Sequence, residues 1–168
     1  FLYCSNTINL KPSSDGSTIP LYTGGIVGYA DNCTIDSCKN YGEIDSKFGS
    51  GSNEGGICGY IINSTQIKFC YNVGLINSQF MPGGVVGTAK GNNTISNCKN
   101  INSIATSTSG FYAGGIIGFA DGNASDKIEI FDCYNSGNIS APQQSGGIIG
   151  SINNFPSSIK FCYNTGKA

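Results

Sequence analysis

Six of the eight cysteines return at one position of a repeated pattern, and thiols are the most reactive side chains in this sequence. A column of this kind is either a ladder of small buried residues or, in a secreted chain, a series of disulfides. Stacked strands lie about 4.8 Å apart, which a disulfide accepts, but their equivalent side chains point the same way. We therefore expect free thiols, with disulfides as the alternative. The cysteine column consists of Cys4, Cys38, Cys70, Cys98, Cys133 and Cys162. Disulfides would join neighbours, as Cys4–Cys38, Cys70–Cys98 and Cys133–Cys162.

Other reactive groups give little basis for catalysis. The chain has no His and no Arg, so an enzyme would depend on paired carboxylates. Asp31 and Asp121 occupy equivalent turns but would lie three coils, or about 14 Å, apart. Cys33 and Cys58 stand outside the cysteine column, and without a CxxC pair or His they make no zinc site. We predict that the protein is not an enzyme and has no catalytic residue, no cofactor and no metal site.

Charge and hydropathy exclude two classes of partner. The net charge is −1, charged residues make up 11% of the chain, and all nine basic residues are Lys. No basic patch is present, so we expect no nucleic-acid binding. No apolar run approaches the roughly 18 residues that cross a membrane, so we expect no membrane insertion.

Asparagine recurs in two settings. One column follows each Cys by two residues, where Asn tolerates turns and its amide can form a ladder of hydrogen bonds. A second set forms N-x-S/T sequons, which would carry N-glycans in a eukaryotic secreted protein; the alternative is ordinary polar turns. The first set is Asn6, Asn40, Asn72, Asn100, Asn135 and Asn164. The sequons are at Asn32, Asn63, Asn92, Asn123 and Asn138, the first four on equivalent turns.

The elements that position these side chains are repeats. A Gly-Gly block, first seen as GGIVGYA, begins at residues 24, 55, 83, 114 and 146. A second anchor follows, with Cys and Asn two residues apart, and then an x-Gly-x-Ile pattern, which the third repeat breaks with Asn102. Such periods indicate stacked coils. The chain opens and closes in mid-repeat, so we expect residues 1–168 to be a single array within a longer solenoid.

The pieces are short, β-branched and bounded by Gly or Asn, which favours strands over helices. Three short strands per turn predict an all-β fold, a parallel, right-handed β-solenoid of about five coils of 28–35 residues. The connections that vary in length all lie at one corner, which is either a binding face or plain loops. They are residues 11–23, 45–54, 78–82, 105–113 and 140–145.

Strand alternation places one set of Gly-Gly block residues inside the solenoid and a second set outside. An apolar outer stripe must be covered, either by another solenoid, domain or filament neighbour or by the long corner loops. The predicted outer stripe consists of Val27, Val86, Ile117, Ile149, Tyr29, Tyr60 and Phe119.

The Gly-Gly-[Ile/Val]-x-Gly block followed by a Cys-[Tyr/Lys]-Asn turn resembles the GLUG-motif repeats of bacterial and protist surface proteins, with Ile or Val at the Leu place. The resemblance covers all five repeats. It implies a β-solenoid in a large extracellular or cell-surface, adhesin-like protein. With no HExxH motif, nothing catalytic carries over.

We therefore expect a structural or adhesive stalk or filament element, which binds protein through lateral or end-to-end contacts. The alternative is a carbohydrate-binding module that uses exposed aromatic residues to bind glycans. These are Tyr22, Tyr29, Tyr60, Phe80, Phe111, Tyr112 and Phe119.

Overall fold

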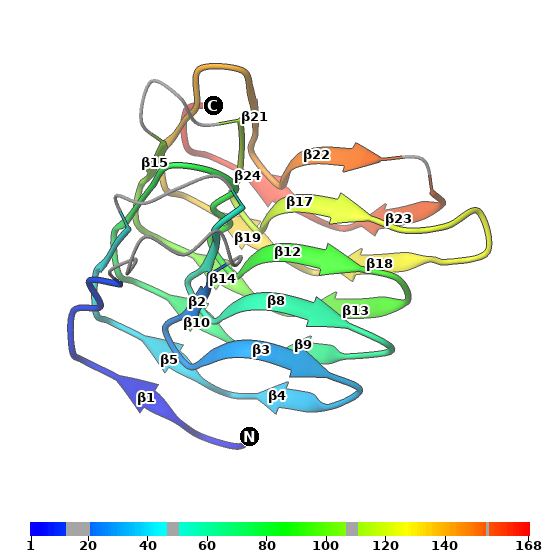
Figure 1. Ribbon diagram of the computed structural model, residues 1–168, viewed down its shortest axis with the longest axis horizontal. Helices are drawn as coiled ribbons and strands as arrows, with labels where there is room; N and C mark the ends of the chain where they lie inside the picture. The colour runs from blue at the N-terminus through cyan, green and yellow to red at the C-terminus, as the bar shows by residue number, and fades with distance from the viewer. Residues whose placement is uncertain (13–20, 47–50, 107–110, 154) are drawn as a thin grey trace.

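The computed structural model describes residues 1–12, 21–46, 51–106, 111–153 and 155–168 (Figure 1). Every paired strand in this part of the chain is parallel to its neighbour in the next coil, and the described residues contain no helix. The stacked coils form an all-β solenoid of about five turns, so the predicted fold class is confirmed. Each short strand gains its backbone hydrogen bonds from the coils before and after it.

Four sheets run along the solenoid. The front sheet contains β3 (Val27–Asp31), β8 (Cys58–Ile62), β12 (Val86–Lys90), β17 (Ile117–Asp121) and β22 (Ile149–Asn153). The back sheet contains β4 (Thr34–Asp36), β9 (Gln66–Lys68), β13 (Asn93–Ser96), β18 (Ile128–Phe131) and β23 (Ser157–Lys160). The asparagine sheet contains β1 (Ser5–Asn6), β5 (Lys39–Asn40), β10 (Tyr71–Asn72), β14 (Lys99–Asn100), β19 (Tyr134–Asn135) and β24 (Tyr163–Asn164). The isoleucine sheet contains β6 (Ile44–Asp45), β11 (Ile76–Ser78), β15 (Ile104–Thr106) and β20 (Ile139–Ser140).

A fifth set of strands precedes the Gly-Gly bend and packs on the front sheet. These outer strands are β2 (Tyr22–Gly24), β7 (Asn53–Gly55), β16 (Tyr112–Gly114) and β21 (Gln144–Gly146). The prediction of three strands per turn was therefore too low. The variable connections were expected as loops, but their described ends supply these strands, while residues 13–20, 47–50 and 107–110 of those connections lie outside the described part.

The last Gly of each block permits this packing. A Cβ on Gly87 would lie 2.7 Å from the backbone nitrogen of Glu54, and one on Gly118 would lie 2.5 Å from the carbonyl oxygen of Met81. Only a residue without a side chain lets the two backbones approach so closely. The outer strands therefore cover much of the front sheet.

The core explains why the predicted outer stripe is partly wrong. Val86 and Ile117 are fully buried in the main core cluster, and so are their neighbours Val85 and Ile116. The chain bends just before these positions, and the amides of both Val85 and Val86 donate to the carbonyl of Ile116. Simple strand alternation does not hold across such a bend, so both side chains enter the core. The corresponding Val27 and Ile149, in the end coils, also pack against that cluster.

The repeat also requires an unusual backbone conformation. The residue before each column Cys has a positive φ, near 55° in all six copies, although none of them is Gly. A side chain in this left-handed region costs about 1–2 kcal/mol. The turn from the back sheet to the asparagine sheet recurs in spite of that cost. These residues are Tyr3, Ser37, Phe69, Asn97, Asp132 and Phe161.

Candidate functional site

The outer surface of the front sheet carries two clusters of aromatic side chains, together called here the aromatic surface. The first consists of Tyr22 on β2, Tyr29 on β3 and Tyr60 on β8. The rings of Tyr29 and Tyr60 are nearly parallel, with centroids 5.7 Å apart, and Tyr22 lies 4.9 Å from Tyr60. Tyr22 and Tyr29 are 38% and 48% exposed. This cluster is therefore open to a partner.

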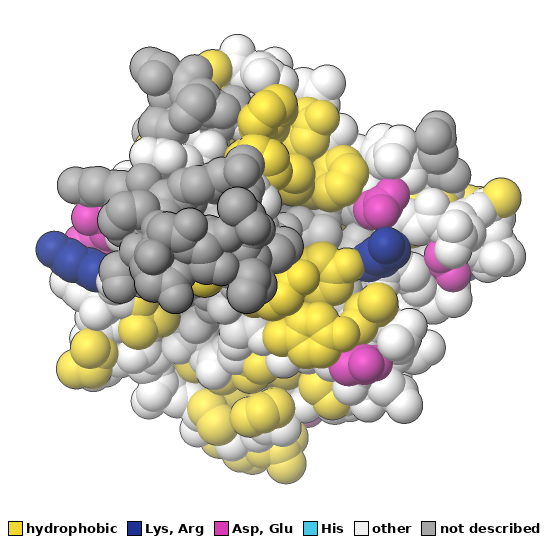
Figure 2. Space-filling view, viewed as in Figure 1, with side chains coloured by type: hydrophobic (Ala, Val, Ile, Leu, Met, Phe, Trp, Pro, Cys, Tyr) yellow, Lys and Arg dark blue, Asp and Glu magenta, His cyan; other side chains and the backbone are white. Residues whose placement is uncertain are grey.

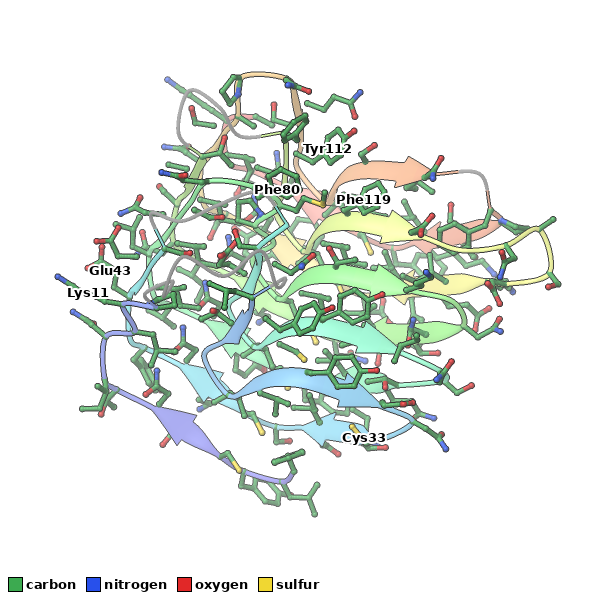
Figure 3. All side chains as sticks on the ribbon, in the orientation of Figure 1. Lys11, Cys33, Glu43, Phe80, Tyr112 and Phe119 are labelled. Atoms are coloured by element: carbon green, nitrogen blue, oxygen red, sulfur yellow. The ribbon has the colours of Figure 1, made fainter. Side chains whose placement is uncertain are left out.

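The second cluster lies further along the same face and consists of Phe80, Phe111, Tyr112 and Phe119. Tyr112 on β16 stacks on Phe119 of β17 at 5.3 Å, and Phe80 meets the ring of Phe111 at 4.7 Å. The amides of Phe111 and Tyr112 both donate to the carbonyl of Phe80, which fixes the loops that carry these rings. Figure 3 shows Phe80, Tyr112 and Phe119 gathered beside β17, and Figure 2 shows apolar side chains over this region.

Thr88 separates the two clusters. It takes the place of the aromatic residue in the third coil, pairs with Tyr60 and Phe119 across the sheet, and is nearly buried. Its hydroxyl donates to the side-chain oxygen of Asn53 on the outer strand β7. This hydrogen bond holds the outer strand β7 against the front sheet between the two clusters.

The aromatic surface carries no charge of its own near neutral pH. Burial, and then the neighbouring Tyr22 and Tyr29, raise the pKa of Tyr60 to about 12. At the far end of the front strands Lys90 approaches Asp121 at 4.0 Å. The surface is therefore apolar with phenol hydroxyls, chemistry that fits burial against protein or stacking on a sugar.

The structure brings together part of the predicted outer stripe. Tyr29, Tyr60 and Phe119 lie on the aromatic surface, whereas Val86 and Ile117 are buried within the chain and cannot contact a partner. All seven aromatic residues predicted as glycan contacts fall in the two clusters. The repeat pattern located the first-strand aromatics, but Phe80 and Phe111 come from connections of variable length.

The cysteine column is a ladder of free thiols, and Cys33 and Cys58 are free as well. Each column thiol donates to the carbonyl two residues earlier in its own coil, as Cys98 does to Ser96 at 3.1 Å. Burial raises the pKa of Cys98, and burial raises that of Cys58 to about 12. Buried thiols with raised pKa values are poor nucleophiles. Cys58 and Cys98 therefore contribute to core packing. The structure contains free thiols in the cysteine column and not the alternative disulfides.

The asparagine column is a continuous ladder of side-chain amides. Each Nδ2 donates to a backbone carbonyl two residues on in its own coil, and each except that of Asn164 also donates to Oδ1 of the next Asn. Asn72, for example, donates to Asn100 and to Gly74, both at 2.8 Å. The second Gly of each block packs on this ladder, because a Cβ on Gly56 would lie 2.3 Å from Cγ of Asn72. The two sequence anchors of the repeat thus meet in space.

The five sequon asparagines are all exposed. Asn32, Asn63, Asn92 and Asn123 lie on the turns between the front and back sheets, along one edge of the solenoid, whereas Asn138 immediately precedes β20. Asn63 donates to Asp31 at 3.0 Å and Asn92 to Asp126 at 3.1 Å. N-glycosylation stays a prediction.

One buried acid was not singled out from the sequence. Glu54 on β7 is fully buried beside Ser46, Ser52 and Ser78. It pairs across the outer strands with Thr23, so an acid replaces an uncharged residue there. The replacement of an uncharged residue by an acid at this position was the only feature of the sequence that could have pointed to Glu54. In the part of the chain that the structure describes, no three Cys, Asp or Glu side chains converge to hold a metal ion.

A search of the described residues for a helix long and apolar enough to span a bilayer found none. Comparison with protein-family models, with curated proteins and with solved structures gave no match.

Proposed function

We propose that this solenoid is a structural or adhesive element of an extracellular or cell-surface protein, and that it associates side by side with a second copy through the aromatic surface. The observation that carries the proposal is the pair of ring clusters on one face, uncharged and partly exposed. Aromatic residues are enriched at the core of protein interfaces because they bury a large area at little entropic cost. The resemblance to GLUG-motif repeats is consistent with this location and role.

We also propose end-to-end contacts, in which a further coil stacks on an end coil. Ile159 is 46% exposed, whereas the equivalent Ile35, Ile67, Ile95 and Ile130 are fully buried. A coil added beyond β23 would cover this residue and pair with the strand edge.

The test is sedimentation velocity over a range of protein concentrations. We expect the unmodified chain to associate, and the double variant Tyr29→Lys, Phe119→Lys to stay monomeric, because a lysine in the contact would be desolvated without a partner. Tyr41→Lys is the matched control, since Tyr41 is 50% exposed but lies outside the aromatic surface. A chain that stays monomeric at every concentration would refute lateral self-association.

The second candidate is carbohydrate binding by the same rings. It is favoured by the parallel pairs Tyr29–Tyr60 and Tyr112–Phe119, which place flat apolar rings and phenol hydroxyls together on the surface. Binding to a glycan array that disappears in Tyr112→Ala would support this function. An array without signal would exclude it for the glycans displayed.

A further inference from the structure

Glu54 is a fully buried carboxylate whose hydrogen bonding is incomplete. The hydroxyl of Ser78, at the end of β11, donates to Oε2 at 2.5 Å. Oε1 has no hydrogen-bond partner. A buried charge is normally paired with an opposite charge or bound to a metal ion, and no lysine forms an ion pair with Glu54 among the described residues.

Two further unpartnered oxygens lie at the same place. The hydroxyls of Ser46 and Ser52 are buried, with residue exposures of 1% and 2%, and neither makes a hydrogen bond of good geometry. With Oε1 of Glu54 they are the only buried side-chain nitrogen or oxygen atoms without a partner in the described structure. Both hydroxyls nevertheless lie close enough to Glu54 to act as weak hydrogen-bond donors that lower its pKa, although burial outweighs them and leaves that pKa raised.

This arrangement has the character of a cation site. Four oxygens, one from a carboxylate and three from hydroxyls, come together from β7, β11 and the residues flanking β6 and β7. Oxygens that approach a carboxylate without a well-formed hydrogen bond, as those of Ser46 and Ser52 do, can be bridged to it by an ion that each of them coordinates. All four are hard ligands, which suit s-block cations and not zinc or copper. One carboxylate neutralises one positive charge, so a divalent ion would leave buried charge uncompensated.

The site borders a depression in the surface. Ser46 and Ser78 also line an open depression of about 450 Å³, together with Asn77, Thr106 and the carboxylate-bearing Asp45.

We propose that Glu54, Ser46, Ser52 and Ser78 bind a monovalent alkali cation such as sodium, which joins the isoleucine sheet to the outer strand β7. Sodium and a proton compete for the same carboxylate, so binding strengthens as pH rises. The ion would secure the outer strand beneath the aromatic surface. This inference does not depend on the proposed partner.

The experiment is thermal unfolding of the purified chain in sodium, potassium or choline chloride at equal ionic strength and at two pH values, neutral and below 5. At neutral pH we expect a higher midpoint in sodium than in choline, rising with the logarithm of sodium concentration as for any ligand of the native state. The sodium effect should shrink at the acidic pH. Glu54→Gln should abolish it, whereas the exposed Glu129→Gln should retain it.

Ser52→Ala separates ion binding from simple packing. In choline chloride the loss of an unpartnered buried hydroxyl should leave the midpoint unchanged or raise it. In sodium chloride the same variant should require a higher sodium concentration for the same gain. Equal midpoints in all three salts would overturn the proposal. The unpartnered oxygens would then be explained by a protonated Glu54 or by a buried water molecule. Stabilisation by millimolar calcium but not by sodium would also overturn it.

Discussion

The asparagine ladder gives the most direct quantitative prediction, which is that Asn100→Ala destabilises the fold by about 3–4 kcal/mol. Asn100 is fully buried; it accepts from Asn72 at 2.8 Å and donates to Asn135 at 2.7 Å and to the Asn102 carbonyl at 2.8 Å. Each such bond contributes about 1 kcal/mol net, and a buried group left without a partner adds to the cost. Typical domains have a total stability of about 5–15 kcal/mol, so the effect is easily measured.

The assay is urea denaturation followed by circular dichroism and by tyrosine fluorescence, whose agreement checks that unfolding is cooperative. The matched control is Asn164→Ala at the exposed end of the ladder, where one amide bond from Asn135 is lost together with two solvent-exposed bonds to the backbone of Gly166. We expect it to cost about 1 kcal/mol. The isosteric Asn100→Asp keeps the acceptor for Asn72 but directs an oxygen at the oxygen of Asn135. At neutral pH it should cost more than Asn100→Ala and recover in part on acidification. Equal costs for Asn100→Ala and Asn164→Ala would refute the ladder as a source of stability.

Three further predictions concern single positions. Phe69→Asn should stabilise by about 0.5–1 kcal/mol in urea denaturation, because Phe69 is exposed and has a φ of 54°, which Asn tolerates better; a loss of stability would show that the ring contributes more than the backbone strain costs. Alkylation without reductant, read by intact mass, should modify all eight thiols after unfolding but leave Cys38, Cys58, Cys70, Cys98 and Cys133 unmodified in the native chain; fewer than eight in the unfolded chain would reveal disulfides. In sodium-free buffer the stability should fall as pH rises above about 4.3, by at most about 1.4 kcal/mol per pH unit, because burial raises the pKa of Glu54 and the native state holds its proton longer than the unfolded state does. Glu54→Gln should show a smaller fall, and an identical pH profile would contradict the assignment.

The regular part of the fold could be predicted because stacking places equivalent residues on top of one another. Asn72 contacts Asn40 and Asn100 whatever else the coil contains, so its recurrence in the sequence is itself the evidence of contact. The buried positions of Val86 and Ile117 could not be predicted, because the bend before them breaks the alternation of faces on which that reasoning depended. Glu54 could not be predicted from the repeat, because it occurs only once and lies in a connection of variable length. No equivalent residue in the other coils indicated that it would be buried.

The direction of the asparagine ladder limits how coils can be added. From Asn6 to Asn135 every Nδ2 donates to the Asn of the next coil toward the C-terminus. The N-terminal end therefore presents an amide oxygen, Oδ1 of Asn6, and the C-terminal end presents an amide N–H, on Nδ2 of Asn164. An amide oxygen meets an N–H only if an added coil has the same polarity as the coils already present. Joining two like ends would oppose oxygen to oxygen or N–H to N–H in a position that is buried in every inner coil. The proposed end-to-end association would therefore have to be head to tail. The aromatic surface lies along the side of the solenoid, so the proposed lateral association would be free of this restriction.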